Sequence, residues 1–375
     1  MVLNYKNKKS ETDIINIKIK NDLQSVICFG SGDNKLIEGD NFRVMKILLD
    51  KFNMNKKIDL VYIDPPFATN NIFKYNEDKT ATISSSVEDK IAYIDDLRGE
   101  KYIEFLRERL ILIRELMANH ASIYLHIDYK IGHYVKIIMD EIFGVKNFRN
   151  DITRIKCNPK NFKRKGYGNI KDMILFYTKS NDYIWNEPLI PFSDEEIINL
   201  YKKKKQNGVR YTTVPLHAPG ETKNGESGQA WNDLKPPKGR HWRYDKETLN
   251  KLQAQGLIEW SSSGNPRRIV FAAEAKEKGK RVQDIWEYKD YQYPNYPTEK
   301  NIDLLMFILK TSSNEGCLVL DAFCGASTTL LACQKLKRNW IGIDNSQVAI
   351  KKSIEKINNS RNLYIENNYT YMKLS

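Results

Sequence analysis

A carboxylate, two prolines and an aromatic ring follow one another directly after a short apolar run. The run is Asp59–Asp64, and the motif is Asp64-Pro65-Pro66-Phe67. Short runs rich in β-branched and aromatic residues are typical of strands that are buried on both faces of a parallel sheet. Ligands of open α/β sheets bind beyond the carboxyl ends of the strands, so the sequence places this motif at a candidate binding site.

These groups suit an amino group that has to become a better nucleophile. The two prolines fix the chain and remove two backbone donors, which leaves carbonyl oxygens as acceptors beside the Asp64 carboxylate. Two acceptors of this kind hold both hydrogens of an exocyclic base amine. Phe67 offers a flat surface for stacking, and a base in a duplex has to leave the helix to reach it. A tight turn with a buried aromatic residue explains the same motif without any site.

A second stretch has the layout of a nucleotide-type site. Asp321-Ala322-Phe323-Cys324-Gly325-Ala326-Ser327-Thr328-Thr329 follows an apolar run and opens a helical pattern, and a further apolar run ends at Asp344. A turn of small residues lets a ligand approach the backbone, and an acid about 20 residues further on binds ribose hydroxyls. The stretch lacks the glycines of a dinucleotide site and the lysine of a P-loop. Adenosyl ligands without phosphates therefore remain.

Alternating strand and helix patterns position both motifs. The runs predicted as strands are 59–64, 122–127, 173–177, 317–321 and 340–344, and helical spacing occurs at 103–117, 135–143, 304–309 and 328–336. This alternation predicts an open, mostly parallel α/β sheet. Gly, Pro, Trp, Tyr and basic residues break the pattern between 181 and 290. We therefore expect three parts, namely 1–180, an inserted region at 181–290, and 291–375.

Most of the net charge lies in one window of the chain. Residues 154–281 hold 26 Lys+Arg and 14 Asp+Glu, a net charge of +12 in a chain of net charge +13. A surplus that is confined to one segment suits a surface that binds a polyanion such as nucleic acid. The run Lys202–Lys205 is by itself more typical of a solvated loop. The aromatic residues of the window are individually more typical of packing than of base contacts.

Composition excludes several other classes of protein. A chain of 375 residues with 41% hydrophobic residues is long enough to bury a core, and no apolar run reaches the roughly 18 residues of a membrane span. The five cysteines share no C-x-x-C spacing, and the five histidines are scattered. We therefore expect no disulfide framework and no metal site, but reduced thiols in a cytoplasmic protein.

The order of these motifs resembles that of the beta-class DNA amino-methyltransferases of bacterial restriction-modification systems, in particular type III modification subunits. The Asp64–Phe67 motif comes first, the basic insertion follows, and the turn around Phe323 comes last. Smaller likenesses lie at Glu38–Asn41, Tyr124–Tyr129, Asp140–Gly144, Gly239–Tyr244 and Tyr296–Lys300. The resemblance covers roughly residues 36–350. It implies the adenosylmethionine-dependent methyltransferase fold with circularly permuted motif order, and an inserted target-recognition region.

The resemblance also implies an activity and a set of site residues. The activity is transfer of a methyl group from S-adenosylmethionine to adenine N6 of duplex DNA, by base flipping and direct transfer. The implied catalytic residues are Asp64, Pro65, Pro66 and Phe67, and the implied cofactor-binding residues are Asp40, Asp64, Thr298, Lys300, Asp321, Phe323, Gly325, Ser327 and Asp344. The implied DNA-binding residues are Lys202, Lys203, Arg240, Trp242, Arg243, Arg267 and Arg268.

The sequence departs from the family in two places. Gly325-Ala326-Ser327 stands where Gly-Ser-Gly is usual, which puts a Cβ where the cofactor normally approaches the backbone, and Asn301 replaces a usual proline. His126 and Asp128 either line the site or form a strand-end pair that is satisfied within the core.

Three alternatives remain open from the sequence. They are methylation of cytosine N4, methylation of adenine in RNA, and a DNA-binding subunit with little activity. The family associates Asp-Pro-Pro-Phe with adenine and Ser-Pro-Pro-Tyr with cytosine N4, which favours adenine. Carbon methylation of cytosine is disfavoured because the sequence contains no Pro-Cys dipeptide. Duplex DNA is the expected partner. A second copy of the chain and a cognate restriction endonuclease are also compatible with the resemblance, and no membrane association is expected.

Overall fold

The chain divides into two compact units. The computed structural model describes residues 2–30, 32–66, 72–75, 90–94, 99–159, 163, 165–222, 225–291, 299–360 and 368–375. Unit 1 spans Met1–Glu187 and Gln283–Ser375, and unit 2 spans Pro188–Val282. The insertion expected at 181–290 extends beyond unit 2 at both ends. One reason is that β17 (Ile285–Glu287) pairs with β7 (Phe148–Ile155) in the sheet of unit 1.

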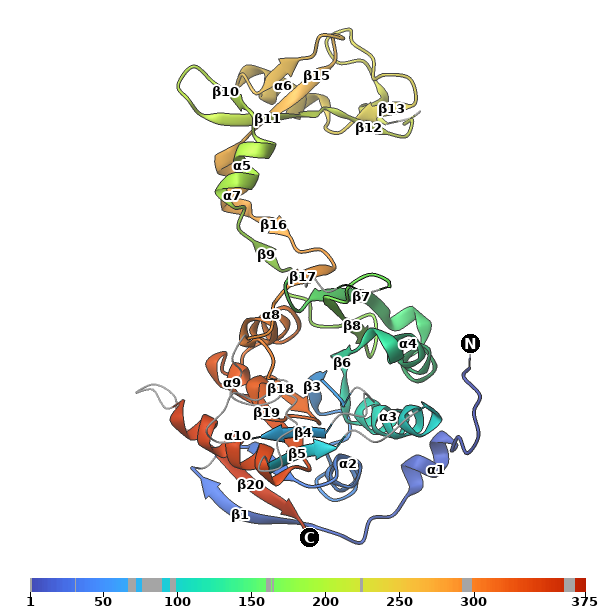
Figure 1. Ribbon diagram of the computed structural model, residues 1–375. Coiled ribbons are helices and arrows are strands. Elements are labelled where there is room, and N and C mark those ends of the chain that lie inside the picture. Colours follow the sequence, from blue (N-terminus) through green and yellow to red (C-terminus); the bar gives the residue numbers. More distant parts are fainter. Residues whose placement is uncertain are drawn as a thin grey trace. The chain divides into compact units, whose positions relative to one another are not determined.

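Unit 1 is built on a sheet in which ten of the described strands take part (Figure 1). In spatial order they are β1 (Leu23–Phe29), β20 (Tyr369–Leu374), β2 (Asn34–Glu38), β19 (Asn339–Asp344), β18 (Leu318–Asp321), β3 (Ile58–Ile63), β6 (Met117–Ile127), β8 (Lys171–Thr178), β7 and β17. All neighbours from β20 to β6 run parallel. The predicted open, mostly parallel α/β sheet is therefore confirmed.

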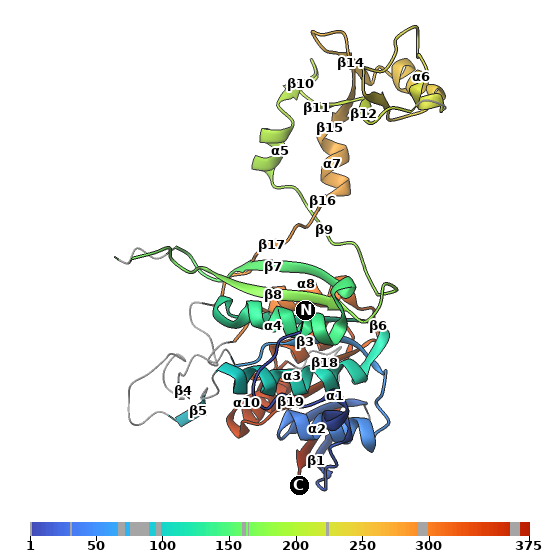
Figure 2. The same ribbon diagram turned by 90° about the vertical axis from the view of Figure 1, so that its right-hand side faces the viewer.

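Two features of this sheet matter for the site. Strands β3 and β18 pair in parallel although they come from opposite ends of the chain. Their carboxyl ends, which carry the two predicted motifs, therefore meet at one edge of the sheet. Strand β8 departs from the parallel arrangement expected for residues 173–177, because it pairs antiparallel with both β6 and β7 (Figure 2). It returns from β7 as a hairpin, a connection that needs no crossover helix.

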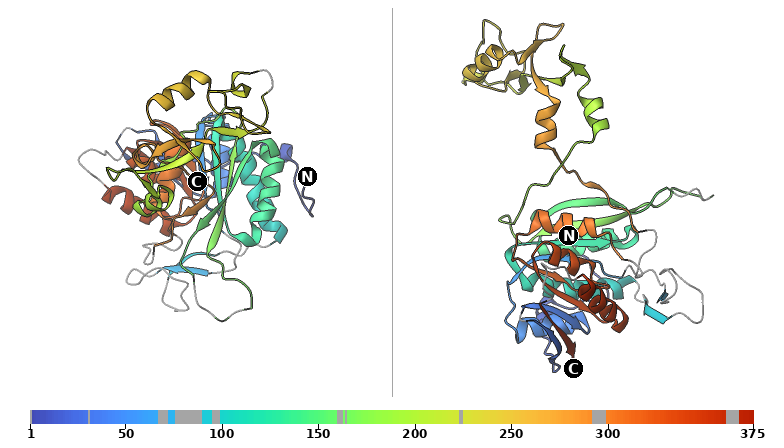
Figure 3. Two further views of the ribbon diagram at one scale, coloured as in Figure 1. Left: turned by 90° about the horizontal axis from the view of Figure 1, so that it is seen from above. Right: turned by 90° about the vertical axis from the view of Figure 1, so that its left-hand side faces the viewer.

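Helices cover both faces of the sheet. One set consists of α2 (Asn41–Asp50), α3 (Gly99–Leu116) and α4 (Tyr129–Phe143), with α1 (Glu11–Asn16) packed on α3. The other consists of α8 (Ile302–Ser312), α9 (Thr328–Lys335) and α10 (Gln347–Asn359), the orange-to-red helices in the right panel of Figure 3. In α3 the fully buried Leu106, Leu110 and Ile113 recur at helical spacing. Each such side chain contributes about 1.5–3 kcal/mol to the free energy of unfolding.

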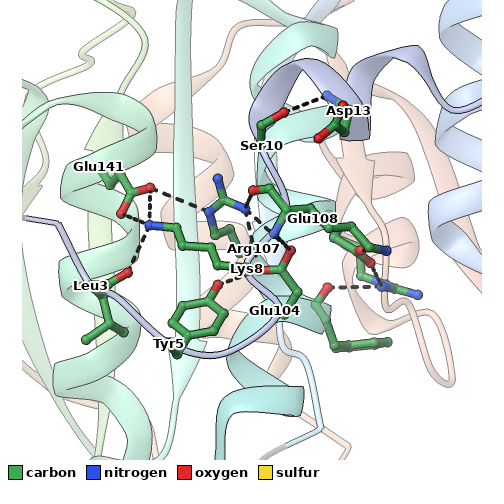
Figure 4. Close-up of polar contacts among 12 residues, drawn as sticks. Leu3, Tyr5, Lys8, Ser10, Asp13, Glu104, Arg107, Glu108 and Glu141 are labelled. Atoms are coloured by element: carbon green, nitrogen blue, oxygen red, sulfur yellow. Dashed lines mark hydrogen bonds and ion pairs between the residues drawn. The ribbon is translucent and has the colours of Figure 1, made fainter.

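Polar contacts fix the N-terminal segment against α3 and α4 (Figure 4). Lys8 Nζ donates to Glu141 Oε2 at 2.8 Å and to the Leu3 carbonyl at 2.9 Å. Tyr5 donates its hydroxyl hydrogen to Glu104, and Arg107 donates to the Lys9 carbonyl at 2.9 Å. Residues 3–9 are thus part of the folded unit. The described part of the chain also contains β4 (Ile72–Tyr75), β5 (Lys90–Ile94) and the 3-10 turn η1 (Val145–Asn147).

Unit 2 has its own small core. Its main sheet has the order β10 (Lys203–Lys204), β11 (Arg210–Pro215), β15 (Pro266–Phe271) and β14 (Ile258–Trp260). Two further pairs are β12 (His217–Pro219) with β13 (Arg240–Trp242), and β9 (Leu189–Ile190) with β16 (Lys280–Arg281). Helix α6 (Lys246–Ala254) and the 3-10 turn η2 (Glu226–Gly228) complete it, and α5 (Asp194–Leu200) and α7 (Ala272–Lys278) lie side by side. Leu216, Trp231, Trp242 and Leu249 form its apolar centre.

Within the described residues, none of the helices combines the length and the apolar character that crossing a membrane requires.

Candidate active site

Asp64 follows β3 directly, at the edge where the parallel strands end. Its Oδ2 atom forms an ion pair with Lys300 Nζ at 2.9 Å. Its Oδ1 atom is buried and accepts no hydrogen bond. The side chain as a whole is 17% exposed. A buried carboxylate oxygen without a donor is uncommon, and here it offers acceptor capacity to a ligand.

Two further acids end the neighbouring strands. Asp321 is the last residue of β18 and Asp344 is the last residue of β19. Burial raises the pKa of Asp321 to about 7, and the carboxylates of Asp64 and Asp344 act in the same direction. The three carboxylates form an acidic cluster that favours a cationic ligand. Asp344 also holds the turn after β18, because its Oδ2 atom accepts the Gly325 N–H at 2.8 Å.

Ser327 stands where the family usually has its second glycine, and its side chain is fully buried. Ser327 lies at φ 60°, a left-handed conformation that favours glycine and costs other residues roughly 1–2 kcal/mol. Its side chain is fully buried and donates to Ser353 Oγ at 2.5 Å, and Ser353 donates to the Gly325 carbonyl at 2.9 Å. The extra Cβ therefore points into the protein. The expectation that the Ser327 side chain faces the cofactor is corrected.

Asp40 is held by Arg109, a residue that the sequence did not identify as part of the site. Arg109 on α3 donates to Asp40 Oδ2 at 2.8 Å and to Asn41 Oδ1 at 2.6 Å. Asn41 in turn donates to the Ala322 carbonyl at 2.7 Å. The Arg109 guanidinium lies 3.6 Å from the ring centre of Phe105. These contacts connect the segment before α2 with the turn after β18.

Phe105, the ring beside Arg109, also contacts Phe323 in the turn after β18. The rings of Phe105 and Phe323 lie 6.2 Å apart, so Phe323 packs against α3. One sequence signal could have identified Arg109. It is a positively charged residue one helical turn after Phe105, so the two side chains lie on the same face of α3. A local pattern of this kind does not identify its partners.

The remaining predicted positions divide into three groups. Phe67 and Thr298 lie outside the described residues. Lys300, expected near the cofactor, is paired with Asp64. Asp128 is 7% exposed and caps α4 by accepting the Lys130 N–H at 2.9 Å, so its role is structural. Asp128 therefore does not form a strand-end pair with His126, whose Nδ1 atom lies 3.9 Å from Asp64 Oδ1.

The residues expected to contact DNA lie in unit 2, and most of them are surface cations. Arg240 and Arg243 are exposed, and Arg240 lies 3.2 Å from His217 Nδ1. Lys202 is exposed, and Lys203 forms an ion pair with Glu259. Burial lowers the pKa of His217, and Arg240, Arg243 and Arg267 act in the same direction. We call these three arginines the arginine cluster.

Three of the expected DNA contacts are bound within unit 2. Trp242 is 1% exposed and packs against Trp231. It is a core residue of unit 2, and the expectation that it contacts DNA is wrong. Arg267 donates to the Thr213 carbonyl at 2.7 Å, which positions it within the sheet. Arg268 donates to the Tyr244 hydroxyl at 3.0 Å. Both arginines are half-buried.

The sequence shows clear relatives. The DNA methylase family of N6/N4 type matches residues 58–356. The Type II methyltransferase M.EcaI of Enterobacter cloacae is 38% identical over 367 residues, which cover 95% of this chain and 77% of that protein. The Type II methyltransferase M.HpaI of Haemophilus parainfluenzae is 33% identical over 88% of this chain and 76% of that protein.

Type III enzymes are also among the relatives. The Type III restriction-modification enzyme StyLTI Mod subunit of Salmonella typhimurium is 26% identical over 81% of this chain and 50% of its own length. The chain thus spans about half of that subunit. The family match extends from β3 through the turn after β18 and into α10, so it includes both motifs of the sheet edge. The chain therefore belongs to the N6/N4 family of DNA methylases.

Proposed function

We propose that the protein transfers a methyl group from S-adenosylmethionine to adenine N6 in duplex DNA. The observation that carries this proposal is the free acceptor Oδ1 of Asp64, which lies at the same strand-end edge as the turn after β18. An amino group that donates a hydrogen bond to Asp64 Oδ1 would lie next to a methyl donor bound at the turn after β18. Cytosine N4, adenine in RNA and a subunit with little activity are the other outcomes of the test.

The residues of this edge fit the proposed methyl donor. The sulfonium is a cation, and Asp64, Asp321 and Asp344 supply negative charge at three adjacent strand ends. Gly325 at φ 48° gives a tight turn without a Cβ before α9. The donor supplies an electrophilic methyl group when it is bound. Asp40, held by Arg109, supplies a further acceptor at the end of β2.

The side chains then act on the amino group. Asp64 Oδ1 accepts one N–H and orients the nitrogen lone pair. The prolines after Asp64 leave their neighbouring carbonyls as acceptors for the second N–H. Lys300 holds the other carboxylate oxygen at 2.9 Å and keeps the carboxyl plane in place. The target base reaches this edge by leaving the duplex.

The test of the proposed function measures the base that is modified. The full chain is incubated with tritium-labelled S-adenosylmethionine and mixed-sequence duplex DNA, and the DNA is then digested to nucleosides. We expect the label in N6-methyladenine. Label in N4-methylcytosine, label only when RNA replaces DNA, or no transfer by a folded protein that binds DNA would each contradict the proposal.

Binding of the methyl donor is expected to strengthen as the pH rises. Asp321 has a pKa of about 7 in the free protein, so it is largely protonated at pH 6. A bound cation favours the carboxylate, so binding lowers this pKa and releases a proton. The affinity therefore rises by up to about tenfold per pH unit below pH 7 and levels off above it.

Calorimetric titration between pH 5.5 and 8 measures this dependence. S-Adenosylhomocysteine, which has a neutral sulfur and the same ionisable groups, serves as the reference ligand. The difference in slope between the two ligands should vanish in Asp321→Asn. If the affinities of both ligands change equally with pH in the unmodified protein, the charge on sulfur does not affect the pKa of Asp321.

The two exposed members of the arginine cluster, Arg240 and Arg243, are expected to bind DNA phosphates. Arg240→Ala and Arg243→Ala should each lower affinity for DNA of any sequence and reduce the slope of log K against log salt by about 0.9. Lys251→Ala is the matched control, because Lys251 is an exposed cation of the same unit that pairs with Glu247 at 2.8 Å. If the slope of log K against log salt changes in Lys251→Ala and not in the arginine variants, Arg240 and Arg243 do not contact the DNA phosphates.

A further inference from the structure

A buried polar chain runs from Asp64 into the sheet. His126 on β6 is fully buried, and Asp172 on β8 is 2% exposed. The Nδ1 atom of His126 lies 3.9 Å from Asp64 Oδ1 and 3.0 Å from the Tyr62 hydroxyl. The Nε2 atom lies 3.2 Å from Asp172 Oδ2. The imidazole thus lies between the site carboxylate and a second, deeper carboxylate.

Asp172 is held as a carboxylate. Its Oδ1 atom accepts from Lys156 Nζ at 2.6 Å, and Arg154 NH1 lies 3.5 Å from its Oδ2 atom. Burial opposes its ionisation, but the hydrogen bonds from His126 and Lys156 outweigh burial and hold the pKa of Asp172 well below its usual range. A carboxylate only accepts hydrogen bonds, so Nε2 of His126 carries the proton that points to Asp172.

This tautomer decides what the other ring nitrogen does. Burial lowers the pKa of His126 and Lys300 acts in the same direction, so the imidazole is neutral at pH 7. With the proton on Nε2, Nδ1 has a lone pair and accepts the Tyr62 hydroxyl hydrogen. Nδ1 has no hydrogen to give to Asp64, in agreement with the unfilled Oδ1 atom. Among the residues that the structure describes, the charged or titratable groups around the ring include Tyr62, Asp64, Asp172 and Lys300, with Arg154 and Lys156 behind Asp172.

We propose that His126 takes up, through Asp64, the proton that the target amine loses, and that Asp172 fixes the tautomer in which it does so. This inference rests on the proposed function. The N–C bond forms as the S–C bond of the donor breaks, and the electron pair of that bond stays on sulfur. The amine proton passes to Asp64 Oδ1, and the carboxyl then donates it to Nδ1 in place of Tyr62. The imidazolium is stabilised by Asp172 until the proton returns to solvent.

His126 acts through Asp64, so it is a positioning residue, and its loss should affect turnover rather than binding. His126→Gln keeps an amide that hydrogen-bonds to Asp172 but has no basic nitrogen. We expect kcat to fall roughly 10²-fold while the KM for DNA and the affinity for S-adenosylmethionine stay within twofold. An unchanged kcat would overturn the proposal.

His120→Gln is the matched control for this variant. His120 is on the same strand, pairs with Asp59 at 2.7 Å and lies at the opposite end of β6. The same substitution there removes a His–Asp contact that is partly exposed and lies far from the site. A loss of kcat in His120→Gln equal to that in His126→Gln would show a general effect on the sheet and contradict the proposal.

Nitrogen NMR of the histidine-labelled full chain tests the tautomer without any activity. His126→Gln identifies the His126 signals among those of the five histidines. We expect Nε2 protonated and Nδ1 unprotonated at pH 7. Asp172→Asn donates an amide N–H to Nε2 and should move the proton to Nδ1, with a loss of kcat similar to that of His126→Gln. A proton on Nδ1 in the unmodified protein would refute the inference.

Failure of this inference is distinguishable from failure of the proposed function. If the unmodified protein methylates adenine and His126→Gln does so at the same rate, only the inference fails. If the unmodified protein transfers no methyl group to any DNA, the proposed function fails, and the inference fails with it even where the tautomer is as expected.

Discussion

Asp64→Ala is expected to lose methyl transfer almost completely and to keep DNA binding. The variant removes the free Oδ1 acceptor, so no side chain holds the amine or takes its proton. A group of this kind contributes roughly 10³-fold to kcat. DNA affinity should stay within about twofold, because the arginine cluster lies in unit 2. Transfer of label to DNA and a parallel gel-shift titration measure the two quantities.

Two comparisons identify the cause of that loss. Asp64→Asn keeps an amide oxygen in place of the carboxylate oxygen that pairs with Lys300 at 2.9 Å, and so separates the charge of the carboxylate from its shape. Asp59→Ala is the control on the same strand, because Asp59 binds His120 and the Leu318 N–H at the opposite end of β3. It should lower Tm and leave kcat near the unmodified value. An Asp64→Ala protein that methylates DNA at the unmodified rate would remove Asp64 from the mechanism.

The parts of the site that the sequence predicts are those with local signals. Strand β3 and the motif after it are predicted because an apolar run and two prolines are recognisable without any tertiary contact. The same holds for β18, the turn around Gly325 and β19. Once the sheet is predicted as mostly parallel, the strand ends lie along one edge by geometry, so Asp64, Asp321 and Asp344 are expected at that edge. That they end neighbouring strands follows from the strand order β19-β18-β3.

The parts that the sequence does not predict depend on which elements pack together. Arg109 is found beside Asp40 only because α3 packs on α2. Asp172 reaches His126 only because β8 inserts antiparallel beside β6, whereas a parallel neighbour was expected. Such contacts join residues that are far apart in sequence. A periodic pattern states which face of an element is buried, but it does not name the element that covers it.

Unit 2 shows a different limit. Interleaved aromatic and basic residues between 154 and 281 predict a surface for a polyanion, yet they do not distinguish core from surface. Trp242 and Arg243 are adjacent in sequence, and one is 1% exposed whereas the other is exposed. Trp242 is the last residue of β13 and packs against Trp231, whereas Arg243 follows the end of the strand and is exposed to solvent. The register needed for this assignment comes from pairing with β12.

Arg109→Lys is expected to weaken binding of the methyl donor while keeping the positive charge. Arg109 donates to Asp40 at 2.8 Å, to Asn41 at 2.6 Å and to the Phe105 carbonyl at 3.0 Å, and its guanidinium stacks on that ring. Lysine is a single point charge and does not reproduce a planar fork. Asp40 and Asn41 should therefore lose their fixed orientation. We expect about a tenfold loss of affinity for S-adenosylmethionine, about 1.4 kcal/mol, measured by calorimetry.

Arg107→Lys separates this effect from a general weakening of α3. Arg107 lies on the same helix, is equally buried, and donates to the Lys9 carbonyl at 2.9 Å and toward Glu104, where the N-terminal segment docks. Its replacement removes a comparable fork without contact to Asp40 or Asn41. We expect both variants to lower Tm by a few degrees, and only Arg109→Lys to lower the affinity. If both variants weaken binding equally, Arg109 serves the fold alone, and the orientation of Asp40 does not depend on its guanidinium.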